Sequence, residues 1–244
     1  FNEIIPCIYD ELSVVDYDDN FIVFTKYGRE ENDEKYGILN FTGKVVIPPI
    51  YKTAFVIEGQ NAFVLQNSSG YYGVINAHGK VIIPFEWEWI SSNYKNGLLG
   101  VRKGHKEGVV DLSGRIVIPI TYDKIGVSCE SGLFSAKMND YWGIVDLSNN
   151  VIIPFEYDCI KFSWYGQAIL VKYESVWSVL DYEGNLLSDL PEEHEDADLI
   201  SPSIVHVCDI SEDEEWRFYR VDLNEYLSTT YLRHCIAGHY QDNI

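Results

Sequence analysis

The stretch YWGIVDLSNNVIIPFEYDCI, residues 141–160, decides the fold, because the chain carries three further copies of its pattern. These are KYGILNFTGKVVIPPIYKTA at 35–54, YYGVINAHGKVIIPFEWEWI at 71–90 and KEGVVDLSGRIVIPITYDKI at 106–125. Each copy has a glycine at its third position: Gly37, Gly73, Gly108 and Gly143. Consecutive glycines are 36, 35 and 35 residues apart. A fixed period of this size predicts a tandem array of small structural units.

Each repeat contains three short apolar segments separated by turn residues. In the repeat that contains residues 141–160, they are GLFSAKM at 132–138, YWGIVD at 141–146 and NVIIP at 150–154. Short segments rich in Val, Ile, Leu and aromatic residues, bounded by Gly, Asn, Asp or Pro, are typical of β-strands. The sequence therefore predicts an all-β fold built from three-stranded antiparallel units.

The connection between the second and third segments has the composition of a tight hairpin. An Asn or Asp stands three residues before a Gly or Asn in the pairs Asn40/Gly43, Asn76/Gly79, Asp111/Gly114, Asp146/Asn149 and Asp181/Gly184. The first residue can hydrogen-bond to backbone groups of a turn, and the second tolerates a positive φ angle. Prolines follow at Pro48, Pro84, Pro119 and Pro154. Because proline has no N–H to donate, we expect it to end the third strand or to lie on its free edge.

We expect a single β-repeat domain spanning residues 1–244. Residues 1–34 form a partial N-terminal repeat, 35–187 the regular repeats, and 188–244 a degenerate, acidic C-terminal repeat and cap. The fifth repeat is already altered, with Ser178 in place of the glycine and Asp189 in place of the proline. Atypical terminal repeats favour a curved open array, in which they cover an apolar end. A closed six-bladed, propeller-like ring is the alternative.

This pattern of Tyr/Trp-Gly, two apolar residues, Asn/Asp, Gly, Lys/Arg and V-I-I-P resembles the bacterial WG-repeat family over roughly Lys35–Leu187. Glu107, in place of the aromatic residue, and Ser178 depart from the pattern. The resemblance implies a β-rich binding module, found in surface, envelope or defence contexts. It implies no catalytic residue.

Charge indicates the kind of partner. The net charge is −20, and residues 173–244 contribute −14 of it, with 17 acidic and 3 basic side chains. Such a field disfavours nucleic acid and anionic membranes and favours a basic protein. No apolar run is long enough to cross a bilayer, so we expect no membrane insertion. Five scattered cysteines favour a reducing, cytoplasmic location, with the cell envelope or secretion as the alternative.

Catalytic and metal-binding patterns are weak. The closest His/Cys group, His234, Cys235 and His239, lacks a second ligand cluster nearby in sequence. The acidic run Asp209–Glu215 lacks the glycine of a calcium loop. We therefore expect no enzyme, no cofactor and no metal site.

The aromatic row Tyr51, Trp87, Tyr122 and Tyr157 recurs with the repeat, so we expect it to be core. Recognition is expected instead from non-repeated aromatic residues and from the acidic C-terminal part. The predicted partner-binding residues are Trp89, Tyr94, Trp164, Tyr165, Glu192, Glu193, Glu195, Asp196, Asp198, Glu212, Asp213, Glu214 and Glu215.

We predict a non-enzymatic protein-binding module, one form of which is an immunity protein that neutralises a basic toxin. The alternatives are an envelope-associated carbohydrate-binding protein and a structural repeat domain of a larger protein.

Overall fold

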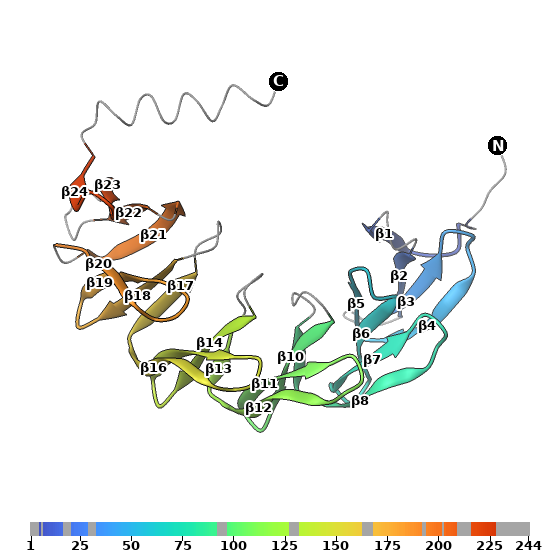
Figure 1. Ribbon diagram of the computed structural model, residues 1–244. Coiled ribbons are helices and arrows are strands. Elements are labelled where there is room, and N and C mark those ends of the chain that lie inside the picture. The colour runs from blue at the N-terminus through green and yellow to red at the C-terminus, as the bar shows by residue number, and fades with distance from the viewer. Residues whose placement is uncertain are drawn as a thin grey trace, which may run out of the picture. The chain divides into compact units, whose positions relative to one another are not determined.

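The computed structural model describes residue 5 and residues 7–16, 21–28, 33–91, 97–126, 132–162, 168–191, 194–201, 203–208 and 216–227. Within these ranges every secondary-structure element is a β-strand, which confirms the predicted all-β class. The strands form four-stranded antiparallel sheets (Figure 1). The chain consists of two compact units, one with residues 1–129 and 147–149, the other with 130–146 and 150–244.

The first unit contains three sheets with the strand orders β1-β2-β3-β4, β5-β6-β7-β8 and β12-β11-β10-β9. Its strands are β1 Glu11–Asp16, β2 Phe21–Tyr27, β3 Glu34–Asn40, β4 Val45–Tyr51, β5 Thr53–Ile57, β6 Ala62–Gln66, β7 Tyr72–Asn76, β8 Val81–Trp87, β9 Trp89–Ser91, β10 Leu98–Lys103, β11 Lys106–Asp111, β12 Ile116–Tyr122 and β13 Lys124–Ile125.

The second unit contains the paired strands β14, β15 and β16 and the sheets β17-β18-β19-β20 and β21-β22-β23-β24. Its strands are β14 Leu133–Met138, β15 Tyr141–Asp146, β16 Val151–Tyr157, β17 Cys159–Phe162, β18 Ile169–Tyr173, β19 Val176–Leu180, β20 Leu186–Asp189, β21 Asp196–Ser201, β22 Ile204–Cys208, β23 Trp216–Arg220 and β24 Glu225–Tyr226.

The predicted three-stranded unit is wrong, because the segment after each proline is itself a strand. Only Lys52 separates β4 from β5, and β5 pairs with β6 from Thr53↔Gln66 to Ile57↔Ala62. The sequence pattern does not mark this segment as a strand, because it is short and its partner comes later in the chain. Each sheet therefore takes its first strand from the tail of one sequence repeat and its other three from the next.

The hairpin between the third and fourth strands forms as predicted. The Asn40 side-chain oxygen accepts hydrogen bonds from the backbone N–H groups of Thr42 and Lys44, at 3.1 and 3.0 Å. Gly43 has a φ of +79°, and Asn149 takes the same left-handed conformation with a φ of +62°. The spacing of Asn or Asp and Gly thus encodes a hairpin with a bonded side chain and a left-handed residue.

The glycine after the aromatic residue is required by a bulge in the fourth strand. In the first sheet Tyr36 pairs with Tyr51 and Ile38 with Ile47, so three residues of β4 lie opposite the single Gly37. A Cβ atom on Gly37 would lie 2.7 Å from the Ile47 carbonyl oxygen. Register shifts at the same place recur in the next three repeats. Proline lies within this bulge on the edge strand. We expected it either at the end of the strand or on its free edge, and the free edge is correct.

The fifth repeat has neither the glycine nor the bulge. Val179 pairs with Ser188 and Ser178 with Asp189, without a shift between them. The Ser178 hydroxyl donates to the Asp189 carboxylate at 2.6 Å. The glycine and the proline are therefore lost together with the bulge, because both residues belong to it.

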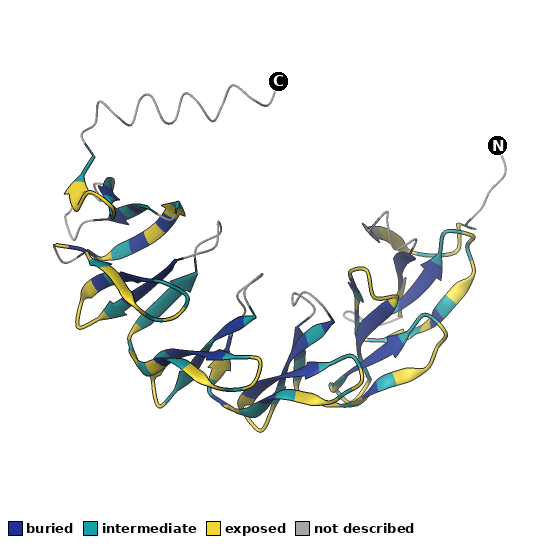
Figure 2. Cartoon of the chain, viewed as in Figure 1, coloured by how far each residue is buried: buried dark blue, intermediate teal, exposed yellow. Residues whose placement is uncertain are grey.

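The cores lie between neighbouring sheets of each unit. In the first unit Ile38, Ile47, Phe63 and Leu65 pack together in one cluster, and Figure 2 shows buried segments along the middle strands. Burial of one large apolar side chain stabilises a fold by roughly 1.5–3 kcal/mol. In the aromatic row, Trp87 and Tyr122 are buried and Tyr51 and Tyr157 are half-buried, so their expected role in the core is confirmed.

Candidate partner-binding surfaces

Trp89, the first predicted binding residue, is half-buried in β9. The Arg102 guanidinium lies 5.4 Å from the centre of its ring, a cation–π distance. Arg102 donates two hydrogen bonds to one carboxylate oxygen of Glu107, at 2.9 and 2.5 Å. Trp89 is therefore held in a three-residue stack, and Arg102 covers part of the ring that a partner would use.

The contacts of Glu107 explain why this position departs from the repeat pattern. It is only 5% exposed and lies opposite Tyr122 in the sheet. Its second carboxylate oxygen accepts the backbone N–H of Ile125 at 2.9 Å. A buried carboxylate is tolerated when its oxygens accept hydrogen bonds from a cation and from backbone donors. Glu107 thus fills the position of an aromatic residue with an ion pair.

The two acidic residues of β21 pair within the chain. The Lys161 ammonium lies 2.6 Å from the Asp196 carboxylate and 2.9 Å from that of Asp198. Burial lowers the pKa of Lys161, but the hydrogen bonds to both aspartates outweigh this, so its pKa is raised. Lys161 and Lys172 also lie 5.5 and 5.2 Å from the centre of the buried Trp177 ring. Asp196 and Asp198 have a structural role, and their role in partner binding stays a prediction.

Glu195 differs from these two aspartates. Its side chain is exposed and forms no ion pair with a described residue. Its backbone carbonyl accepts a hydrogen bond from Lys172 at 2.9 Å, which fixes its place next to β21. The other predicted residues lie outside the described ranges: Tyr94, Trp164, Tyr165, Glu192, Glu193, Glu212, Asp213, Glu214 and Glu215. The His234–His239 group and the acidic run Asp209–Glu215 lie outside them too.

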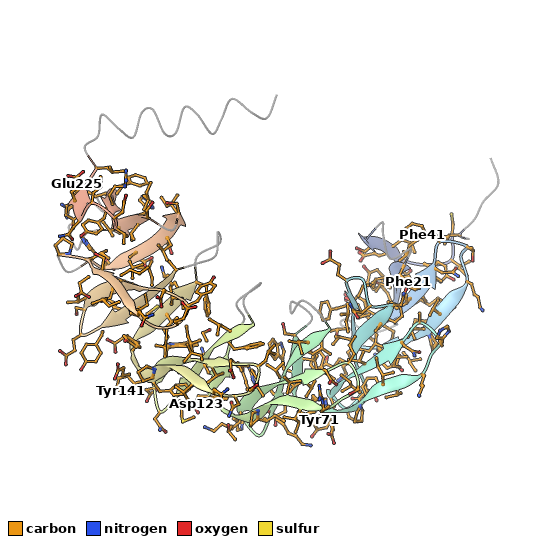
Figure 3. The ribbon with its side chains drawn as sticks, in the orientation of Figure 1. Phe21, Phe41, Tyr71, Asp123, Tyr141 and Glu225 are labelled. Carbon is orange, nitrogen blue, oxygen red and sulfur yellow. The ribbon has the colours of Figure 1, made fainter. Side chains whose placement is uncertain are left out.

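A cavity in the first unit was not foreseen from the sequence. It has a volume of about 590 Å³ and is lined by apolar residues, including Phe21 (labelled in Figure 3), Val45 and Ala77. Lys44 and His78, from the hairpins of the first two repeats, line it as well. Asn40 and Asn61 complete the lining, so half of the residues around the cavity are polar. Lys44 follows the hairpin glycine Gly43, whereas His78 precedes Gly79, so no shared sequence pattern marks the cavity, and only the packing of two sheets forms it.

The described part of the chain contains no group of three or more His, Cys, Asp or Glu side chains placed to hold a metal ion. None of its segments forms a helix of the length and hydropathy that crossing a bilayer requires.

Solved structures with a similar fold are distant in sequence. A eukaryotic initiation factor matches with a TM-score of 0.50 and 10% identity, over 80% of this chain. This chain spans 60% of that protein's length. Hsv2p from Kluyveromyces lactis matches with a TM-score of 0.47 and 10% identity, over 87% of this chain and 76% of its own. The C-terminal WD40 domain of Sif2 matches with 0.44 and 12%, over 86% and 69%. At these identities the likeness concerns the fold alone.

Sequence comparison identifies the family. No curated protein matches the chain. The family model described as WG containing repeat matches residues 36–68, 72–106, 108–142 and 142–177, more than half of the 244 residues. These matches coincide with the four repeats whose hairpins and bulges are described above. The chain therefore belongs to the WG containing repeat family.

Proposed function

We propose that this chain is a non-enzymatic protein-binding module whose acidic part, residues 173–244, engages a basic protein. The observation that carries the proposal is that the polar side chains which recur in every repeat are engaged in their own turns. Asp111, for example, accepts hydrogen bonds from the backbone N–H groups of Ser113 and Arg115. The surface is then what varies between repeats. Its most distinctive variation is the charge of −14 on residues 173–244.

Electrostatic complementarity supports this choice of partner. Opposite charges accelerate encounter and disfavour partners of the same charge. An immunity protein that neutralises a cationic toxin, such as a nuclease, is one specific form of the proposal, and it rests on the same charge. A curved open array, capped by the atypical C-terminal repeats, and a cytoplasmic location remain part of the proposal.

The test measures binding of two probes of similar size, a cationic ribonuclease with a pI above about 9 and an acidic protein. We expect the cationic probe alone to bind, with an affinity that falls steeply from about 0.05 M to 0.5 M salt because screening weakens the attraction. Affinity that does not change with salt, or equal binding of the acidic probe, would contradict the proposal.

A pair of variants separates binding from stability. Replacing Glu192, Glu193 and Glu195 together by Gln should weaken binding of the cationic ribonuclease and leave the Tm unchanged. The matched control replaces Asp196 and Asp198 by Asn, which removes the two ion pairs with Lys161 and should lower the Tm. If the triple variant binds as the wild type does, these three carboxylates are not the binding surface.

A further inference from the structure

The edge of a β-sheet is a site where another strand can add. In four sheets the fourth strand lies at an edge and contains a proline within a bulge: Pro48 in β4, Pro84 in β8, Pro119 in β12 and Pro154 in β16. A proline offers no N–H and a bulge distorts the backbone, so both prevent strand addition. The proline and the bulge therefore protect these four edges against the addition of another strand.

Strand β20 is also the edge of its sheet, but it lacks this protection. Asp189 stands at the position of the proline, and the register shift that surrounds the proline elsewhere is absent. Only the one-residue shift next to the hairpin remains, as in the other four repeats. The fifth repeat has therefore regained a backbone N–H where the others have none.

The direction of that N–H follows from the hydrogen bonds of its neighbours. The Leu190 N–H donates to the Trp177 carbonyl at 2.9 Å, so Leu190 is turned toward β19. In an antiparallel pair, hydrogen-bonding residues alternate, which turns Ser188 toward β19 and the Asp189 backbone away from it. The Asp189 carbonyl accepts the Ser188 hydroxyl at 3.2 Å, and the register turns the Asp189 N–H toward the free edge of the sheet.

The side chains around this edge are apolar and acidic. Leu187 is 50% exposed, and Leu186 is 58% exposed at a position that is exposed in the other four repeats as well, where it holds Val45, Val81, Ile116 and Val151. The hairpin from Val176 to Asp189 contains three acidic residues and no Lys or Arg. An edge with these properties suits an extended segment with apolar and basic side chains, held by backbone hydrogen bonds.

We propose that β20 is a strand-addition site for an extended, basic and apolar segment of a partner protein. The inference rests on the proposed function, since it specifies how the acidic part of the chain would hold a basic protein. Affinity comes from backbone hydrogen bonds along the edge, and selectivity from contacts with the two leucines and attraction to the three carboxylates.

The test uses a synthetic peptide in which Lys and Val alternate, with acetylated and amidated ends. Its affinity is measured for the wild type, Asp189→Pro and the matched control Asp189→Asn, which keeps the N–H. Because the Asp189 N–H is turned away from β19, Asp189→Pro removes no hydrogen bond of the sheet and should fold, and its Tm and circular dichroism verify this. We expect the proline variant to bind about tenfold more weakly than Asp189→Asn.

Further arms use the folded wild type. A peptide N-methylated at alternate residues should bind more weakly, because it cannot complete the ladder of backbone hydrogen bonds. In a separate measurement, hydrogen exchange at the Asp189 N–H should slow when the unmodified peptide binds. Equal binding to all three proteins, equal binding of the methylated peptide, or no binding at all overturns the strand-addition site. If the cationic ribonuclease still binds in a salt-dependent manner, only this inference fails and the proposed function stands.

A second copy of the chain is the competing occupant of this edge. Two acidic edges repel each other, so we expect the wild type to sediment as a monomer. Self-association that Asp189→Pro abolishes would overturn the peptide as the occupant and assign the edge to a dimer.

Discussion

At the residue scale, one glycine per repeat has a purely steric reason. Gly143 lies under the bulge of β16, where a Cβ atom would approach the Ile153 carbonyl oxygen to 2.8 Å. Backbone cannot move aside as a flexible side chain can, so any larger residue strains the pairing of β15 with β16. Ser178 occupies the equivalent position in the fifth repeat, where that shift is absent.

Gly143→Ala should therefore destabilise the protein by about 1–3 kcal/mol, the usual cost of an extra methyl group in a packed site. The matched control is Ser178→Gly, which restores the glycine where no bulge exists and should not stabilise the protein. Chemical denaturation of both variants measures the difference. An unchanged free energy of unfolding for Gly143→Ala would show that the bulge can relax around a methyl group.

At the element scale, the first unit replaces one repeated aromatic residue with a charged network. The Glu107 carboxylate, on β11, bonds to Arg102 on β10 and to the backbone N–H of Ile125 on β13. One side chain thus connects the paired strands β10 and β11 to β13, which belongs to the next sheet. The network also fixes Trp89, since Arg102 is held over its ring.

Glu107→Ala should cost about 1–3 kcal/mol, because it removes a buried carboxylate that accepts hydrogen bonds from Arg102 and from the Ile125 backbone. Lys106→Ala serves as the control. It removes an ion pair with Asp123 (labelled in Figure 3), whose side chains are 46% and 39% exposed. Exposed pairs contribute less than about 1 kcal/mol. Thermal unfolding compares the two, and an equal loss would mean that Glu107 acts only as a surface charge.

At the scale of the whole molecule, the charge of −20 and the bonded turn carboxylates act on stability in opposite directions. Repulsion among acidic groups destabilises the folded chain near neutral pH. The turn carboxylates stabilise it: hydrogen bonds from the Ser113 hydroxyl and from Arg115 lower the pKa of Asp111 from its ordinary 3.8 to about 2. The hydrogen bond from the Asn185 side chain likewise lowers the pKa of Asp181.

The Tm should not rise as the pH falls from about 7 to 5, because carboxyl groups with ordinary pKa values of about 4 stay almost fully ionised in that range. It should then decrease from about pH 4 to 2. A carboxyl whose folded pKa is depressed stabilises the fold above its unfolded pKa, and this is lost as the pH falls toward the folded value. Asp111→Asn, which copies Asn40 and Asn76 of the sibling turns, should weaken the decrease. A decrease as steep as in the wild type would contradict the role given to Asp111.

The sequence by itself determined the period, the all-β class, the family and the hairpin, because these follow from local residue spacing. Asn40 and Gly43, for instance, act within five consecutive residues. It also predicted correctly that Trp87 and Tyr122 of the aromatic row are buried.

Only the tertiary structure decided what depends on strands paired across distance. The first strand of each sheet escaped prediction, since a segment such as Thr53–Ile57 becomes a strand only by hydrogen bonding to β6. The Lys161 pair with Asp196 and Asp198 spans 35 and 37 residues, and no local pattern signals it. The exposed edge of β20 was visible in the sequence as a missing proline, but its meaning required the register of the sheet, which sets the direction of each backbone N–H.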